Sequence, residues 1–135
     1  MENKSISFLK KQRRYTVQII YKLIILQDDT ARMKQEILDG LQLSTKNEEI
    51  IQYIENVIDK YFELRDELEP LLEESWWWER LPMMVRAILI SSLYEIKYYN
   101  TPKAIVIDEA IEMVREFIPS WETNFINAVL DKAQY

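Results

Sequence analysis

The stretch that decides the fold is residues 83–99, MMVRAILISSLYEIKYY, which directly follows Pro82. Apolar side chains occupy nearly every side of this stretch on a helical wheel. Polar side chains interrupt it mainly at Arg86, Ser91, Ser92, Glu95 and Lys97. A helix that is apolar all round is buried by its neighbours, and proline suits the first turn of a helix. The pattern therefore predicts a central helix, the most buried of the protein.

Before the central stretch, the sequence predicts three helices. Residues 4–26 have the periodicity of one long amphipathic helix, and a shorter helix follows that ends near Gly40. Thr45 and Glu48 form a capping box, after which apolar residues repeat at helical spacing as far as Leu68. Pro70 closes this part, so residues 1–70 form an amino-terminal helical half.

Residues 71–135 form a carboxy-terminal helical half. Asn100, Thr101 and Pro102 break the chain after the central stretch, and Pro119 and Ser120 separate the last two predicted helices. A length of 135 residues is that of one domain. We therefore expect a single all-α domain of about six to seven helices.

Three consecutive tryptophans, Trp76, Trp77 and Trp78, lie near the start of the carboxy-terminal half. They cannot all face one core from a helix, so at least one is expected to be partly exposed. Two roles fit the cluster: a packed hinge between the halves, or a platform that stacks on a base or docks a protein.

The composition excludes most enzyme chemistry. Cysteine and histidine are absent, which removes disulfides, thiol nucleophiles, the usual zinc sites and the imidazole base. A phosphate-binding glycine loop is not possible with the single glycine, Gly40. Glu109, Glu112 and Glu116 share a helix face, but a helical di-iron site pairs Glu with His. We therefore predict no enzyme activity, no cofactor and no metal.

The sequence also gives no reason to expect a membrane protein. No uninterrupted apolar run approaches the ~20 residues that span a bilayer. Residues 17–26 are interrupted by Lys22 and residues 81–93 by Arg86, and no small-residue cleavage site follows the basic start. We expect a cytoplasmic protein without a membrane partner.

The charge is distributed unevenly along the chain. The net charge is −6, yet residues 1–26 carry six Lys or Arg and only Glu2 as an acid, which gives them +5 and leaves −11 elsewhere. An acidic body repels nucleic acid at long range, so a polyanion should be drawn to the first helix. The alternative is an ordinary solvated basic face.

The first predicted helix carries its charges on one side. The basic stripe, which we define as Lys4, Ser7, Lys11, Arg14, Gln18 and Lys22, lies opposite the apolar residues on the wheel. Arg13 points with the apolar residues instead, and an unpaired guanidinium is costly to bury. We therefore predict structural ion pairs for Arg13, Glu95 and Glu109, and also for Arg86 within the central helix.

A set of short motifs, in order along the chain, carries a family resemblance. They are Arg13, Val17-Gln18-x-x-Tyr21, Trp78, Glu79-Arg80-Leu81, Arg86-Ala87-Ile88-Leu89, Leu93-Tyr94-Glu95-Ile96, Ile107-Asp108-Glu109-Ala110-Ile111-Glu112 and Phe125-Ile126-Asn127-Ala128-Val129-Leu130-Asp131. Each motif is weak alone, but the ordered set resembles the NusB family over essentially the whole chain.

The resemblance implies a fold and a function. The fold is an all-α domain of two packed three-helix groups. The function is transcription antitermination: the family binds boxA-type single-stranded RNA together with the small-subunit ribosomal protein NusE, within an antitermination complex on RNA polymerase. Carried over by position, the implied RNA-binding residues are Lys4, Lys10, Lys11, Arg14, Gln18 and Lys22, followed by Lys103, Phe117 and Phe125.

Two other functions remain open from the sequence. One is an RNA-targeting module related to that of ribosomal RNA methyltransferases, although no enzyme domain follows within the 135 residues. The other is a helical interaction protein with weak or lost RNA binding, in which the basic stripe is buried in a homodimer interface, as in some NusB homodimers.

Overall fold

Residues 4–135 are described in the computed structural model; Glu2, which the charge count includes, lies outside them. This part of the chain contains seven α-helices, two short 3₁₀ turns and no strand, so the predicted all-α class is confirmed. The helices are α1 (Ile6–Ile25), α2 (Thr30–Leu38), α3 (Glu48–Asp59), α4 (Tyr61–Leu68), α5 (Met83–Tyr98), α6 (Lys103–Phe117) and α7 (Thr123–Asp131). The 3₁₀ turns are η1 (Glu69–Leu71) and η2 (Trp78–Arg80). No helix among the described residues is long and apolar enough to cross a membrane.

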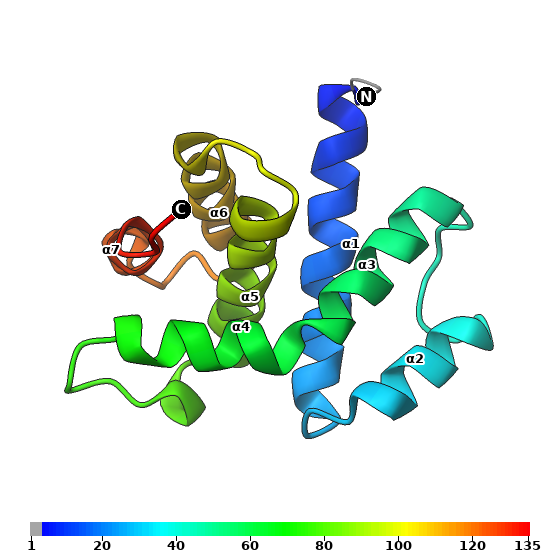
Figure 1. The fold of residues 1–135 in the computed structure, drawn as a ribbon, viewed down its shortest axis with the longest axis horizontal. Helices are drawn as coiled ribbons and strands as arrows, with labels where there is room; N and C mark the ends of the chain where they lie inside the picture. Colours follow the sequence, from blue (N-terminus) through cyan, green and yellow to red (C-terminus); the bar gives the residue numbers. More distant parts are fainter. Residues whose placement is uncertain (1–3) are drawn as a thin grey trace.

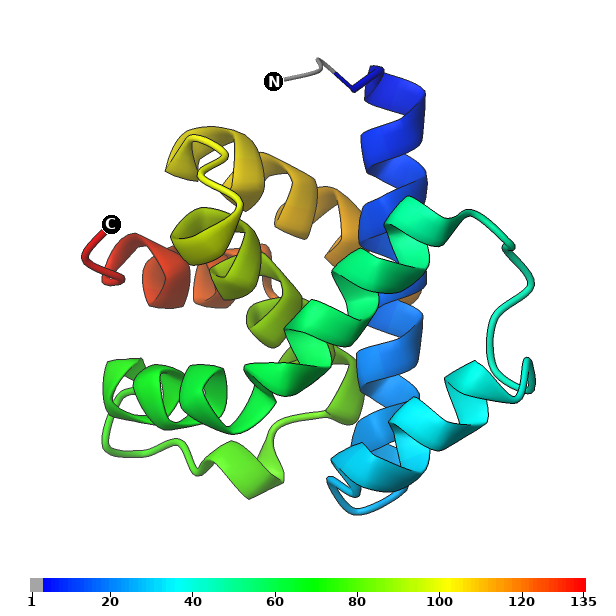
Figure 2. The same cartoon turned by 45° about the vertical axis from the view of Figure 1, so that its right-hand side comes forward.

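Helix α5 is the centre of the fold. It packs against α1, α4, α6 and α7, and eleven of its sixteen residues are buried. In Figures 1 and 2 it lies between α1 on one side and α6 and α7 on the other. The nearly continuous apolar surface of residues 83–99 therefore has neighbours on most of its sides.

Helix α1 is the longest helix of the described chain and runs along the height of the molecule (Figure 1). The Ser5 hydroxyl caps it by accepting the backbone N–H of Phe8 at 3.0 Å. One face, including Val17, Ile20 and Leu23, is fully buried, chiefly against α5 and α3. Helix α2 lies on the opposite side of α1 from α7, while α3 packs across α1 and leads into α4 (Figures 1 and 2).

The third predicted helix is two helices in the structure. The chain leaves helical geometry at Lys60, with φ −100° and ψ 4°, and α4 begins at the next residue. The apolar repeat continues across the break because Val57, Tyr61 and Leu64 are all fully buried. Periodicity alone therefore could not reveal the kink.

The predicted capping box is also wrong in detail. The N-cap of α3 is Asn47, whose Oδ1 accepts the backbone N–H groups of Glu49 and Ile50 at 3.0 and 3.2 Å. Thr45 acts one step earlier, since its hydroxyl accepts the N–H of Asn47 at 3.2 Å. Both residues are good capping types, and the amide of Asn47 satisfies two helix N–H groups at once.

Candidate nucleic-acid interface

The basic stripe of α1 remains at least partly accessible in the structure. Lys11 and Gln18 are exposed, whereas Lys4, Lys10, Arg14 and Lys22 are half-buried. Among residues 4–135, Lys11 takes part in no ion pair. The amino group of Lys22 is 3.4 Å from the carbonyl oxygen of Gln42. Helical geometry thus places several cations along one side of α1.

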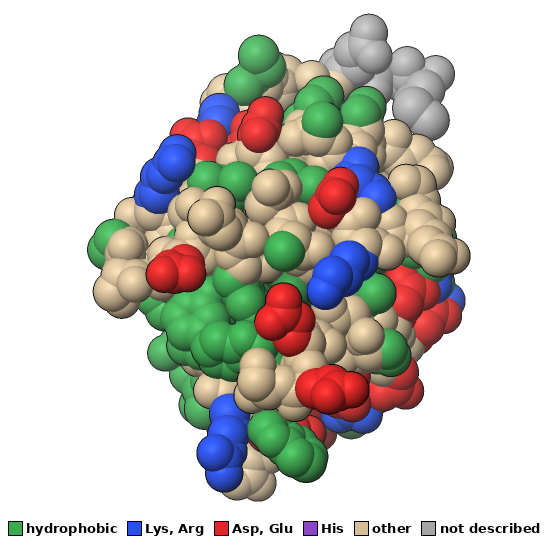
Figure 3. All heavy atoms as spheres, turned by 90° about the vertical axis from the view of Figure 1, so that its left-hand side faces the viewer, with side chains coloured by type: hydrophobic (Ala, Val, Ile, Leu, Met, Phe, Trp, Pro, Cys, Tyr) green, Lys and Arg blue, Asp and Glu red, His purple; other side chains and the backbone are tan. Residues whose placement is uncertain are grey.

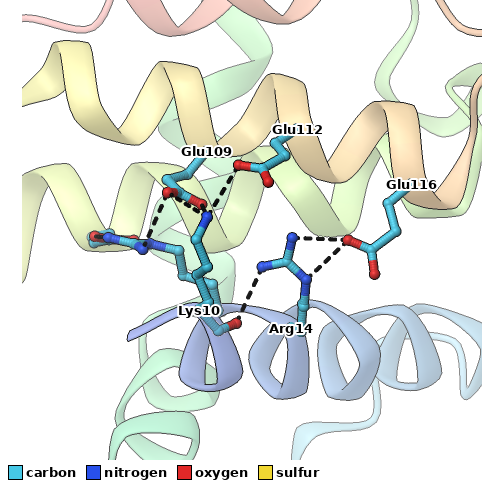
Figure 4. A network of polar contacts seen from close by, with 7 residues as sticks. Lys10, Arg14, Glu109, Glu112 and Glu116 are labelled. Atoms are coloured by element: carbon cyan, nitrogen blue, oxygen red, sulfur yellow. Dashed lines mark hydrogen bonds and ion pairs between the residues drawn. The ribbon is translucent and has the colours of Figure 1, made fainter. Parts of the chain in front are cut away.

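Two of these cations contact acidic side chains of α6 (Figure 4). The Nζ of Lys10 lies 3.1 Å from a carboxylate oxygen of Glu109 and 3.2 Å from one of Glu112. The guanidinium of Arg14 contacts Oε2 of Glu116 through Nε at 2.9 Å and Nη2 at 2.8 Å. The hydrogen bonds that Lys10 donates to Glu109 and Glu112 raise the pKa of Lys10. The acidic face of α6 therefore meets the basic face of α1.

Lys4 precedes α1 and contacts α3 instead. Its Nζ is 2.5 Å from a carboxylate oxygen of Glu49 and 5.4 Å from the ring centre of Phe8. The pair with Glu49 is open to solvent on the glutamate side, where the side chain is 59% exposed. Carboxylates of α3 and α6 are thus paired with Lys4, Lys10 and Arg14.

Arg13 lies on the buried face of α1 and forms a two-pronged ion pair with Glu95 of α5. Its Nε and Nη2 donate to the two carboxylate oxygens at 2.9 and 2.8 Å, and both side chains are almost inaccessible. Burial lowers the pKa of Arg13, but the hydrogen bonds and charge of Glu95 outweigh it and the net pKa is raised. Glu109 is 3.8 Å from Nη1 of Arg13, so it links this pair to Lys10.

The partner of Arg86 differs from the prediction. Its Nε donates to the carbonyl oxygen of Leu81 at 3.1 Å, and no carboxylate pairs with it among residues 4–135. The expected ion pair is therefore replaced by a hydrogen bond to the backbone. The physical reason is local: α5 begins at Met83, and the preceding carbonyl lies within reach of the first turn.

Two of the carboxy-terminal residues expected to bind RNA, Lys103 and Phe125, belong to the region of α7, whereas Phe117 ends α6 one residue after Glu116, which contacts Arg14 of α1. The amino group of Lys103 donates to the carbonyl oxygens of Asp131, at 3.1 Å, and Ala133, so it holds the end of α7. Phe117 is partly buried against the core. Helices α5 and α6 lie between α1 and α7 in both ribbon views (Figures 1 and 2). The structure thus separates Lys103 and Phe125, near α7, from the predicted residues of the amino-terminal segment.

Phe125 belongs to an aromatic groove that sequence reasoning missed. Its ring is 5.3 Å from that of Trp76 and 5.4 Å from that of Trp121, and Trp76 and Trp121 are 5.7 Å apart. The groove has a volume of about 590 Å³. The indole N–H of Trp121 is buried and has no hydrogen-bond partner. Figure 3 shows hydrophobic side chains gathered around a hollow on the side of the molecule where α7 lies.

The tryptophan run divides between core and surface. Trp78 is buried, Trp76 belongs to the groove, and Trp77 is 66% exposed. The run itself indicated that at least one ring is exposed, but nothing in the sequence paired Trp76 with Trp121, 45 residues further along. No group of acidic side chains among residues 4–135 is arranged to hold a metal ion.

Comparison with known proteins places these features in a family. The sequence model of the NusB family matches residues 10–135. The transcription antitermination protein NusB of Campylobacter curvus is 38% identical over 101 residues, which is 73% of this chain and 75% of that protein. The protein of the same name from Macrococcus caseolyticus is 27% identical over 90% of this chain and 92% of its own length.

A third relative matches over a shorter segment. The transcription antitermination protein NusB of Lactococcus lactis is 35% identical over 79 residues, which is 58% of this chain but only 41% of that protein. No solved structure matches the chain.

Proposed function

The chain belongs to the NusB family, and from this premise we propose that it is a transcription antitermination factor that binds boxA-type single-stranded RNA. The observation that supports this function best is the row of cations along α1, which lies on an otherwise acidic protein. Residues 1–26 carry +5 while the remaining residues carry −11. Phosphate groups are attracted to such a stripe and repelled elsewhere.

The proposed RNA contacts are Lys11, Gln18 and Lys22, with Lys4, Lys10 and Arg14 contributing after their carboxylate partners give way. Lys11 and Gln18 are exposed and available without any rearrangement. The aromatic groove at Phe125 offers a second kind of contact, because indole and phenyl rings stack on bases regardless of sequence.

The same proposal includes a basic protein partner, the ribosomal protein NusE, and assembly with RNA polymerase in the cytoplasm. Affinity for RNA alone is expected to be modest, because the net charge of −6 opposes the approach of a polyanion. A basic partner bound beside α1 would complete the positive surface and raise both affinity and sequence preference.

The test is a fluorescence anisotropy titration of a labelled boxA-like RNA, with and without the ribosomal partner. The double variant Lys11→Glu/Arg14→Glu should lose binding, since it reverses two charges on the accessible side of α1. Parent binding should show a log–log salt slope near −3 if about four phosphates are contacted. Circular dichroism of the variant should match that of the parent.

The matched control is Arg32→Glu/Lys34→Glu, which makes the same charge change on α2, at two residues outside the basic stripe. Arg32 and Lys34 form exposed pairs with Glu36 and Asp59, so the fold should tolerate their loss. If the α1 double variant binds RNA as well as the parent does, α1 is not the RNA site. A helical interaction or homodimer function would then take its place, and sedimentation would measure it.

A further inference from the structure

The contacts between α6 and α1 suggest a control on RNA affinity, and this inference rests on the proposed function. We infer that Glu112 and Glu116 of α6 compete with RNA phosphates for Lys10 and Arg14, and so lower the affinity of the free protein for RNA. The three glutamates Glu109, Glu112 and Glu116 follow one face of α6, and this face meets the basic side of α1 (Figure 4). The carboxylates therefore occupy donors that a phosphate would need.

The competition depends on the donors being the same atoms. Lys10 offers one ammonium group, and in this structure it donates to Glu109 and Glu112 together. Arg14 uses Nε and Nη2, one edge of its guanidinium, on Glu116. That edge is the fork that arginine uses to bind a phosphate with two hydrogen bonds. RNA cannot bind these groups in this way until the carboxylates leave them.

The pairs are accessible enough to exchange partners. The side chains of Glu112 and Glu116 are 55% and 45% exposed, and exposed ion pairs are weak because water screens both charges. Glu109 is different, since it is only 16% exposed and also lies beside the buried Arg13. We therefore assign Glu112 and Glu116 to the competition and Glu109 to the fold.

The carboxylates of α6 neutralise much of the positive charge on this part of the α1 surface. Apart from the buried Arg13, residues 10–14 carry three cations, Lys10, Lys11 and Arg14. Because α6 pairs with Lys10 and Arg14, Lys11 is the one of these three that pairs with no carboxylate among residues 4–135. The carboxylates thus neutralise most of the positive charge that the sequence places there. Removing one of them restores a phosphate contact without adding any new cation.

The experiment compares two substitutions that each remove one negative charge from α6. Glu116→Gln removes the competitor of Arg14, whereas Asp108→Asn changes an exposed residue with no ion pair in the described chain. Anisotropy titration of a labelled boxA-like RNA should show that Glu116→Gln raises affinity roughly threefold to fivefold, the upper part of the range for one exposed pair. Asp108→Asn should change affinity by less than about twofold, since its charge acts only through screened solvent. The double variant Glu112→Gln/Glu116→Gln should gain more than Glu116→Gln alone.

A second measurement separates competition from a general change in charge. In an Arg14→Ala background, Glu116→Gln should no longer raise affinity, because the donor at issue is gone. Equal gains from Glu116→Gln and Asp108→Asn, or a gain that persists without Arg14, would overturn the inference while leaving RNA binding intact. If neither the parent nor the double variant binds the RNA even at low salt, the inference and the proposed function are both overturned.

Discussion

Arg13 and Arg14 are neighbours on α1, yet they are placed in opposite environments. Arg13 meets Glu95 in the interior, and Arg14 meets Glu116 at the surface. The shortest nitrogen–oxygen distance is 2.8 Å in both pairs. The side chain of Arg13 is 8% exposed and that of Glu95 5%, compared with 22% and 45% for Arg14 and Glu116. Burial, and not distance, therefore distinguishes the two pairs.

The difference determines what each arginine can do. Separating a buried pair leaves a charge in a medium that solvates it poorly, so Arg13 is committed to the fold. Separating an exposed pair lets water solvate both groups, so Arg14 can change partners at little cost. A step of one residue, or 100° around the helix, converts a structural cation into one available for a ligand.

The largest expected effect comes from breaking the buried pair. Arg13→Ala should lower the free energy of unfolding by about 3–5 kcal/mol, because Glu95 would be left buried without a partner. Urea unfolding followed by circular dichroism measures this loss. A cost no larger than that of Arg14→Ala would contradict the role given to burial.

The hydrogen bond between Tyr61 and Asp28 is intermediate between the buried and the exposed ion pair, because its donor is buried and its acceptor is half-exposed. The hydroxyl of Tyr61, whose side chain is fully buried, donates to Asp28 at 2.6 Å. Tyr61→Phe should cost about 1.5–3 kcal/mol, the range for a hydrogen bond to a charged group. Urea unfolding at neutral pH would show whether the cost falls between those of the two arginine variants.

The raised pKa of Tyr61 should make the stability of the protein depend on pH. Burial, followed by the hydrogen bond to Asp28, raises the pKa of Tyr61 above its usual value of 10.0. The stability from the neutral phenol is therefore fully present below about pH 10 and declines as the pH rises further toward the folded-state pKa. Tyr61→Phe should show a shallower loss of stability above about pH 10 than the parent. Identical alkaline profiles would mean that Tyr61 does not contribute.

Replacing both members of the buried pair should undo most of the damage. Arg13→Met/Glu95→Leu removes both charges and fills the space with apolar atoms, so stability should lie within about 1 kcal/mol of the parent. The test is to compare the melting temperatures of the parent, the double variant and Arg13→Ala. A double variant as unstable as the single one would show that the pair itself, and not the unpaired charge, provides the stability.

The smallest effect should come from the exposed pair. Arg14→Ala is expected to cost less than about 1 kcal/mol of stability, and its cost should shrink further at high salt. Urea unfolding at low and high salt tests both statements. A loss that does not change with salt would indicate packing by the arginine stem in place of ion pairing.

The sequence predicted the helical class and the central α5, because a continuous apolar surface is recorded in the order of the residues themselves. It could not predict the break at Lys60, because the buried face continues through Val57 and Tyr61 as if one helix were present. Asn47 replaced Thr45 as the cap for a similar reason: both are suitable residue types, and only the path of the chain decides between them.

In the candidate site, too, the sequence predicts what depends on neighbouring residues and not what depends on how the helices pack. A helical wheel could place Lys11, Arg14 and Gln18 on one stripe, since that depends only on neighbours in sequence. It could also place Glu109, Glu112 and Glu116 on one face of their helix, but not say what that face contacts. Their contacts with Lys10 and Arg14 join residues 102 positions apart, and such contacts depend on how α6 packs beside α1.

The packing of α1 on α5 has a consequence for how the protein unfolds. These two helices belong to different halves of the sequence, yet they pack together more extensively than any other pair in the described chain. We propose that the halves form one cooperative unit, because separating them would expose the apolar surface of α5 to water. In native-state hydrogen exchange, the central amides of α1 and α5 should open only with global unfolding, at the same free energy. Isolated residues 1–70 should be largely disordered, since α1 would lose the surface against which it packs.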